Sequence, residues 1–160
     1  MIKAIEWVSG KIRLLDQTRL PWEEVYIELE DYRQVAAAIK EMKVRGAPAI
    51  GIAAAYGMAL GAQEIEAASK AKFMAKLSTI SQALAATRPT AVNLFWALER
   101  MKRAAEAVED VAEIKAALLK EAINLEAENL EADRKLSKFG AELIKDGFTI
   151  LTHCNTGALA

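Results

Sequence analysis

The chain has 160 residues, of which 53% are hydrophobic and 27% are charged, which is typical of one globular domain or of one domain with a piece of another. Its 21 basic residues nearly balance its 22 acidic residues, for a formal net charge of -1. A non-specific nucleic-acid binder is therefore not expected, because binding to phosphates needs an excess of cations.

The chain holds one cysteine and one histidine, so we expect no internal disulfide, no metal site and no cofactor. Residues 1–7 mix charged and apolar side chains and lack the apolar core of a signal peptide, which predicts a cytoplasmic protein. As a helix, the uncharged residues 47–62 would span about 24 Å, less than a hydrocarbon core of about 30 Å. They predict a buried helix rather than a membrane segment.

The N-terminal sequence predicts a small β-element. Residues 4–8 and 11–15 are apolar-rich runs separated by Ser9-Gly10, a pair suited to a hairpin turn. Residues 24–30 alternate polar and apolar side chains, which predicts a third, half-exposed strand.

A first helix is predicted to begin after Asp31, a residue suited to cap it, and to end at Gly46. Its predicted buried face consists of Val35, Ala38, Ile39 and Met42. Pro48 suits the first turn of a second helix. The glycines of that helix predict close packing against another backbone, since glycine otherwise weakens a helix; they are Gly51, Gly57 and Gly61.

Three further helices are predicted over residues 69–86, 90–107 and 111–144, with a break near Gly140 as one alternative for the last. The three tryptophans, Trp7, Trp22 and Trp96, are interpreted as core anchors.

The uncharged, β-branched run 148–152 predicts a strand buried on both faces, as in a parallel sheet. No partner strand follows it, so an α/β domain is expected to begin there, and the chain is interpreted as the N-terminal portion of a longer protein. His153, next along this strand, is expected to be a packing residue.

Two arginines stand at predicted helix starts. Arg45 and Gly46 precede the second helix, and Arg88 precedes Pro89-Thr90 at the start of the fourth. A guanidinium beside free helix N–H groups binds anions, so the two motifs together predict a phosphate site. The alternative is a helix-ending glycine and two solvated arginines.

Cys154 follows the predicted strand and precedes small residues that let a ligand approach. Ligands bind beyond the carboxyl ends of strands in open α/β sheets, so the thiol is a candidate acid, base or nucleophile. The alternative is a buried structural cysteine.

Taken in order, four motifs make the chain resemble the methylthioribose-1-phosphate isomerases. They are Asp16-Gln17-Thr18-Arg19-Leu20-Pro21, Val44-Arg45-Gly46-Ala47-Pro48-Ala49-Ile50-Gly51, Arg88-Pro89-Thr90-Ala91-Val92-Asn93-Leu94, and Leu151-Thr152-His153-Cys154-Asn155-Thr156-Gly157. The resemblance implies an α/β protein with a mainly helical N-terminal domain, residues 1–130, that carries a small β-element. Residues 131–160 would begin a Rossmann-like catalytic domain that is cut off at residue 160.

The resemblance also implies a function. The reaction would convert 5-methylthioribose 1-phosphate to 5-methylthioribulose 1-phosphate, a step of methionine salvage, in a homodimer. Arg45, Gly46 and Ala47 match the family's substrate loop, Arg88 its second substrate arginine, and Cys154 its catalytic cysteine. The family's proton-donating aspartate lies beyond residue 160, in the missing C-terminal segment, so we expect the 160-residue chain to be inactive by itself.

Two other functions share these features. Isomerases of ribose 1,5-bisphosphate have the same arginine-glycine loop and cysteine, but the segments 47–51 and 88–90 fit the methylthioribose enzymes better. The regulatory subunits of the exchange factor of translation initiation (the initiation-factor 2B alpha, beta and delta type) share the architecture without catalysis. Cys154 beside both arginines favours an enzyme.

Overall fold

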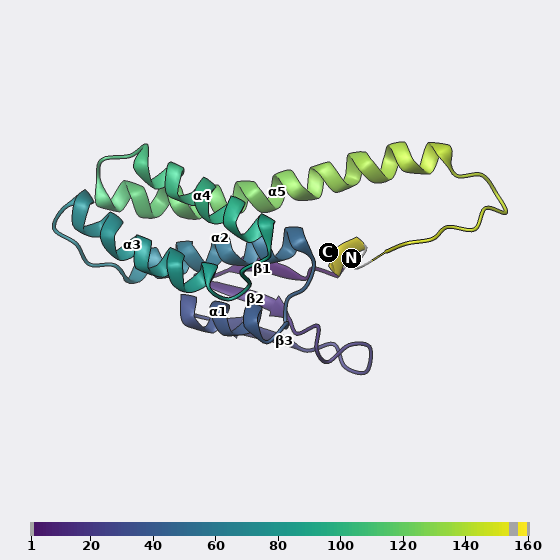
Figure 1. Cartoon of the computed structure of the whole chain (residues 1–160), viewed down its shortest axis with the longest axis horizontal. Helices are drawn as coiled ribbons and strands as arrows, with labels where there is room; N and C mark the ends of the chain where they lie inside the picture. The colour runs from purple at the N-terminus through teal and green to yellow at the C-terminus, as the bar shows by residue number, and fades with distance from the viewer. Residues whose placement is uncertain (1, 154–156, 160) are drawn as a thin grey trace.

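The computed structural model describes residues 2–153 and 157–159 of the chain. A three-stranded antiparallel sheet lies at one side of a helical body (Figure 1), with strand order β1 (Ile5–Val8), β2 (Lys11–Leu15), β3 (Tyr26–Leu29). Ser9 and Gly10 both have positive φ, 50° and 85°, and close the β1–β2 hairpin. The predicted β-element is confirmed.

Five α-helices follow the sheet in the described residues: α1 (Tyr32–Lys40), α2 (Ala47–Glu64), α3 (Lys70–Ala85), α4 (Val92–Glu106) and α5 (Val111–Leu143). A short 3-10 helix, η1 (Gly157–Leu159), lies near the end of the chain. Each predicted helix is present, although α2 extends two residues past the predicted range 47–62, and the mainly helical α/β fold class is confirmed. Among the described residues, none of the helices combines the length and the apolar character that spanning a membrane requires.

The first helix ends earlier than predicted. It stops at Lys40, and Met42 adopts a left-handed conformation with φ 58°. The Lys43 N–H donates to the Ala38 carbonyl at 2.9 Å, and the Met42 N–H to that of Ile39 at 3.2 Å, which closes the helix end without glycine. Met42 is consequently exposed rather than part of the buried face. Gly46, predicted to end α1, instead stands at the start of α2.

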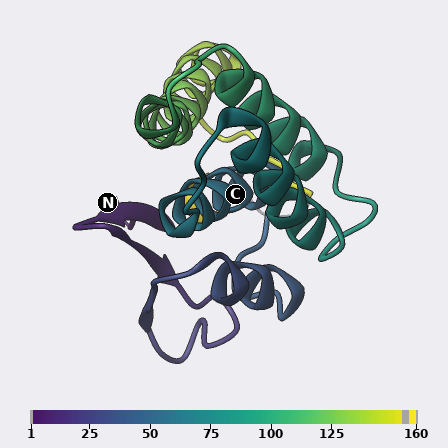
Figure 2. The ribbon, with the colours of Figure 1, turned by 90° about the vertical axis from the view of Figure 1, so that its left-hand side faces the viewer.

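Helix α2 lies at the centre of the body and contacts β1 and the other four α-helices (Figure 2). It is buried continuously from Ala49 to Ala62, as its uncharged sequence predicts. A Cβ at Gly51 would lie 3.0 Å from the backbone carbonyl oxygen of Asn93, so a backbone neighbour is confirmed there. At Gly57 and Gly61 the nearest atoms are side chains instead.

Helix α5 begins packed on the body and then projects beyond it (Figure 1). Its first half buries Ile114, Leu118, Ala122 and Leu125, whereas Leu136, Phe139 and Leu143 are exposed. The helix passes Gly140 without a break and crosses residue 130 without interruption. The division into domains 1–130 and 131–160 stays a prediction.

After α5 the chain turns back toward the body (Figure 1), and η1 lies against the loop that follows β2. The predicted strand 148–152 is wrong for this structure, because that segment pairs with none of the described strands. Leu151 is 97% exposed, and His153 is exposed rather than packed. A strand completes its hydrogen bonds only by pairing with a neighbour, and residues 148–152 do not pair with either edge strand of the described sheet, β1 or β3.

Candidate functional site

Helices α2 and α4 begin side by side. Gly51, one turn after Pro48 on α2, lies against the backbone of Asn93 at the start of α4. Glycine suits this close approach, because a Cβ would lie 3.0 Å from the Asn93 carbonyl oxygen and the backbone of α4 would have to shift to accommodate it. The two arginine motifs, which lie far apart in sequence, are therefore brought to one end of the body.

Both of these helix starts lack a side-chain cap. Gly46, with φ 90°, precedes α2 and has no side chain to offer, and Ala91 precedes α4. Thr90, predicted to start the fourth helix, lies in the turn before it. Backbone N–H groups at an uncapped helix start carry partial positive charge and need a partner.

The two arginines add full positive charges. Arg45 is exposed, and its Nε lies 3.4 Å from the Met42 carbonyl oxygen. Arg88 is half-buried and lies in the turn before α4, where its own backbone carbonyl accepts the Ala91 N–H at 3.0 Å. Among the residues that the structure describes, no carboxylate lies within ion-pairing distance of either guanidinium. This combination of free N–H groups and guanidiniums suits a phosphate.

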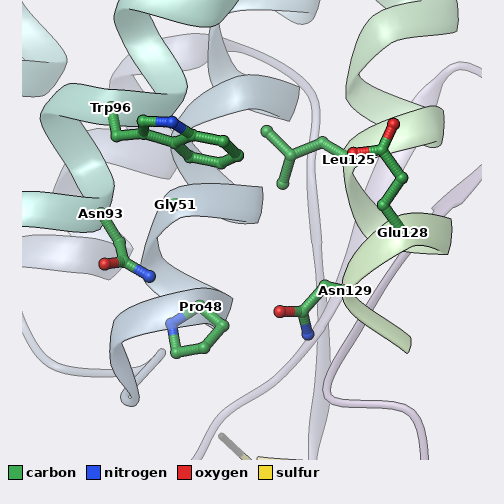
Figure 3. Close-up of a pocket in the computed structure, with 7 residues that line it drawn as sticks. All are labelled: Pro48, Gly51, Asn93, Trp96, Leu125, Glu128 and Asn129. Carbon is green, nitrogen blue, oxygen red and sulfur yellow. The ribbon is translucent and has the colours of Figure 1, made fainter. Parts of the chain in front are cut away.

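A hollow of about 210 Å³ adjoins these helix starts, between α2, α4 and α5. In Figure 3, Asn93 and Asn129 lie on either side of Pro48, and Trp96 and Leu125 point toward each other further along α2. The hollow is lined by Pro48, Gly51, Asn93, Trp96, Leu125, Glu128 and Asn129.

The negative charge of Glu128, the one carboxylate in this lining, is neutralised by Arg100. Two nitrogens of Arg100 donate to Glu128 at 2.6 and 2.8 Å, and its Nε donates to Glu121 at 2.5 Å. These hydrogen bonds to Arg100 hold the pKa of Glu128 below its ordinary value. Glu128 is thus a paired carboxylate beside the hollow rather than a free negative charge.

The first motif of the resemblance also reaches this end of the body. Asp16 is buried, and its carboxylate accepts the N–H and hydroxyl of Thr18 at 3.0 and 2.6 Å. The Gln17 N–H donates to the Lys43 carbonyl at 2.9 Å, and its Nε2 donates to the Leu159 carbonyl at 3.3 Å. Gln17 therefore joins the turn before Arg45 to η1.

Cys154 lies outside the described residues, so its place relative to the arginines stays a prediction. No cluster of three or more His, Cys, Asp or Glu side chains suited to a metal occurs in residues 2–153 and 157–159.

Sequence reasoning missed the contribution of α5. Asn129 and Glu128 sit in a charged helix without a motif, and only the packing of α5 on α2 brings them to the hollow. Leu125 lies one turn before Glu128 and Asn129 on the same face of α5 and is buried, so an apolar residue at this spacing was the one sequence feature that could have indicated that this face packs on the body. Trp96 and Trp22 are 55% and 89% exposed, so their interpretation as core anchors is wrong, whereas Trp7 stacks on buried Tyr56 at 5.8 Å.

Tyr56 also ties α5 to α2, because its hydroxyl donates to the carboxylate of Glu126. Burial and this carboxylate raise the pKa of Tyr56 above its ordinary value, so the phenol stays protonated. The contact sets the position of the α5 segment that carries Glu128 and Asn129.

Comparisons with known proteins cover almost the whole chain. A sequence model of the initiation factor 2 subunit family matches residues 43–160. The methylthioribose-1-phosphate isomerase of Dehalococcoides mccartyi is 53% identical over 99% of this chain and 48% of its own length. That of Syntrophotalea carbinolica is 54% identical over 99% of this chain and 47% of its own.

Two solved structures share the fold. The 5-methylthioribose 1-phosphate isomerase of Pyrococcus horikoshii OT3 has a TM-score of 0.91 and 40% identity, over 99% of this chain and 45% of that one. The translation initiation factor eIF-2B subunit delta from A. fulgidus has a TM-score of 0.88 and 45% identity, over 99% and 46%. The chain thus spans about half the length of the relatives that it matches.

Proposed function

The chain belongs to the initiation factor 2 subunit family, and from that premise we propose that it serves as one part of a methylthioribose-1-phosphate isomerase. The reaction is the conversion of 5-methylthioribose 1-phosphate to 5-methylthioribulose 1-phosphate in methionine salvage. The observation that carries the proposal is the pair of uncapped, arginine-flanked helix starts, α2 and α4, which lie side by side. They occur in a chain 53% identical over 99% of its residues to an isomerase of that name.

The substrate phosphate binds at these helix starts. Arg45 and Arg88 donate charge-assisted hydrogen bonds to its oxygens, and the backbone of Gly46 and Ala47 faces it from the start of α2. Such bonds are about twice as strong as neutral ones. An arginine without a carboxylate partner beside an uncapped helix start has its charge available for this ligand.

The chemistry follows from the position of that phosphate. Because it is attached at C1, the sugar ring cannot open as a free aldose does. An acid protonates the ring oxygen, and a hydrogen moves from C2 to C1, so C2 is oxidised and C1 is reduced within one molecule. No external oxidant or cofactor is required. Cys154 moves the proton or stabilises the charge that develops, and the acid comes from the remainder of the polypeptide.

The remainder of the relatives' length supplies the other parts of the enzyme. We place the acid and a Rossmann-like domain there, and infer a cytoplasmic homodimer as the working form. The isolated 160-residue chain should therefore not turn over the substrate, because it lacks the acid.

A second candidate function is non-catalytic regulation of translation initiation. It is favoured by the structure of the translation initiation factor eIF-2B subunit delta from A. fulgidus, which is 45% identical over 99% of this chain. A regulatory subunit needs the fold but has no use for a reactive thiol or for a bound sugar phosphate.

The test is an assay of the full-length protein with each candidate substrate. We expect ketose formation from 5-methylthioribose 1-phosphate, and little from ribose 1,5-bisphosphate. In the same protein, Cys154→Ala should lower kcat by at least about a hundredfold with little change in melting temperature, and Cys154→Ser, similar in size but far less acidic, should also be poor.

Each outcome assigns a function. Turnover of ribose 1,5-bisphosphate alone would reassign the substrate, and no turnover of either sugar would favour the regulatory function. A fully active Cys154→Ser protein with unchanged pH dependence would remove the thiol from the mechanism.

A further inference from the structure

The hollow between α2, α4 and α5 has two kinds of lining. The carboxamides of Asn93 and Asn129 flank Pro48, in the first turn of α2, whereas Trp96 and Leu125 approach each other further along that helix (Figure 3). Gly51 lies between these two parts of the hollow and adds no side chain to the lining. A Cβ at this position would come close to the Asn93 carbonyl oxygen. The lining therefore carries carboxamides beside the helix starts and, further along, the apolar surfaces of Trp96 and Leu125 with the Arg100-paired carboxylate of Glu128 at their edge.

Trp96 is the unusual member of this lining. Its side chain is 55% exposed, yet it is backed by the guanidinium of Arg100, which lies 5.5 Å from the ring centroid. Arg100 is in turn fixed by Glu121 and Glu128 on α5. The exposed indole is thus positioned at the hollow by Arg100 and its two glutamate partners rather than by burial in the core.

The chemical groups of the proposed substrate follow one another in an order that matches the groups along the hollow. Its phosphate is at C1, its ring carries hydroxyls, and its methylthio group is at the far end of the sugar. Along the hollow, the carboxamides of Asn93 and Asn129 lie beside Pro48 at the start of α2, and Trp96 lies further along. A hollow of about 210 Å³ is several times the roughly 30 Å³ of one water molecule, so a methyl and a sulfur fit.

We propose that this hollow binds the methylthio end of the substrate and that Trp96 determines specificity for it. The proposal rests on the proposed function. A thioether is apolar and polarisable, and contacts between sulfur and aromatic rings are favourable. Asn93 and Asn129 orient the sugar between the two ends by accepting and donating hydrogen bonds to its hydroxyls.

The test compares two substrates in the full-length protein: 5-methylthioribose 1-phosphate and 5-deoxyribose 1-phosphate, which lacks only the methylthio group. Trp96→Ala should lower kcat/KM for the methylthio substrate by about tenfold and leave that for the deoxy sugar nearly unchanged. Trp96→Phe should retain most of the preference, because it keeps an aromatic ring. Phe95→Ala is the matched control, since Phe95 neighbours Trp96 on α4, is 43% exposed and lies outside the hollow.

The outcomes separate the inference from the function on which it rests. An equal loss for both substrates in Trp96→Ala, or no loss for either, would overturn the specificity role while leaving the isomerase intact. Tm measured for each variant distinguishes a lost contact from a damaged fold. A wild-type protein that isomerises neither sugar would overturn the proposed function, and the subsite with it.

Discussion

Three of the five described α-helices begin under a side-chain cap, and two begin without one. Asp31 accepts two N–H groups of α1, Asp110 accepts two of α5, and Ser69 accepts one of α3. The starts of α2 and α4 receive no such bond from the described residues, and they are the two that lie side by side. The uncapped pair is the feature that supports the phosphate site proposed above.

The largest effect is expected from capping an uncapped start. Ala91 has the extended conformation of a cap residue, with φ -83° and ψ 90°, so Ala91→Asp should satisfy free N–H groups of α4 and place a carboxylate there. Binding of the sugar phosphate by the full-length protein should weaken by about ten- to a hundredfold, because the carboxylate repels phosphate and takes its donors. Calorimetric titration measures the change in Kd.

Ala91→Ser is the matched variant, since it caps the helix without adding charge. It should weaken binding less than Ala91→Asp, while both raise Tm. Unchanged phosphate affinity in Ala91→Asp would mean that the start of α4 binds no anion.

A smaller effect is expected from removing a cap that already exists. Asp110→Ala should lower the free energy of unfolding by about 1 kcal/mol, because two N–H groups of α5 lose their acceptor. Asp133→Ala, in the exposed part of α5, should change it by less than about 0.5 kcal/mol. Urea unfolding of each variant gives these values, and an equal loss in both would contradict the assignment of Asp110 as a cap.

The smallest effect concerns Glu128, the carboxylate that borders the hollow but is paired with Arg100. Its pKa is lowered in the folded protein by the hydrogen bonds from Arg100, so the unfolded state binds its proton more readily. The stability from this pair is full above the unfolded value of about 4.3 and is lost as the pH falls through the folded value.

In the Glu128→Gln variant, the free energy of unfolding should therefore decrease slightly less steeply as the pH is lowered below neutral. Unfolding by urea at a series of pH values below neutral measures the slope, with Glu131→Gln as a control on the same helix. A slope unchanged from wild type would mean that the Arg100 pair contributes nothing measurable in solution.

Local signals in the sequence predicted most of the fold. The hairpin pair Ser9-Gly10, the cap Asp31 and Pro48 act on their near neighbours, so each could be recognised without tertiary structure. The resemblance to methylthioribose-1-phosphate isomerases, drawn from four motifs, is confirmed by relatives that match 99% of the chain.

The errors arose where distant or compensating contacts decide the structure. Met42 reverses the chain in a conformation that sequence reasoning assigned to Gly46, because hydrogen bonds to Ala38 and Ile39 stabilise it. The strand predicted at 148–152 depends on pairing with a distant strand, and it pairs with none of the described strands. Asn129 reaches the hollow only because α5 packs on α2.

The claim that the two uncapped helix starts and their arginines hold the substrate phosphate is tested most directly by Arg45→Ala and Arg88→Ala in the full-length protein. Each should raise KM for 5-methylthioribose 1-phosphate by at least about tenfold, since charge-assisted hydrogen bonds contribute about 1.5–3 kcal/mol, and neither should lower Tm, because neither guanidinium forms an ion pair with the described residues. An unchanged KM in both variants would contradict the account and leave the two arginines as solvated surface residues.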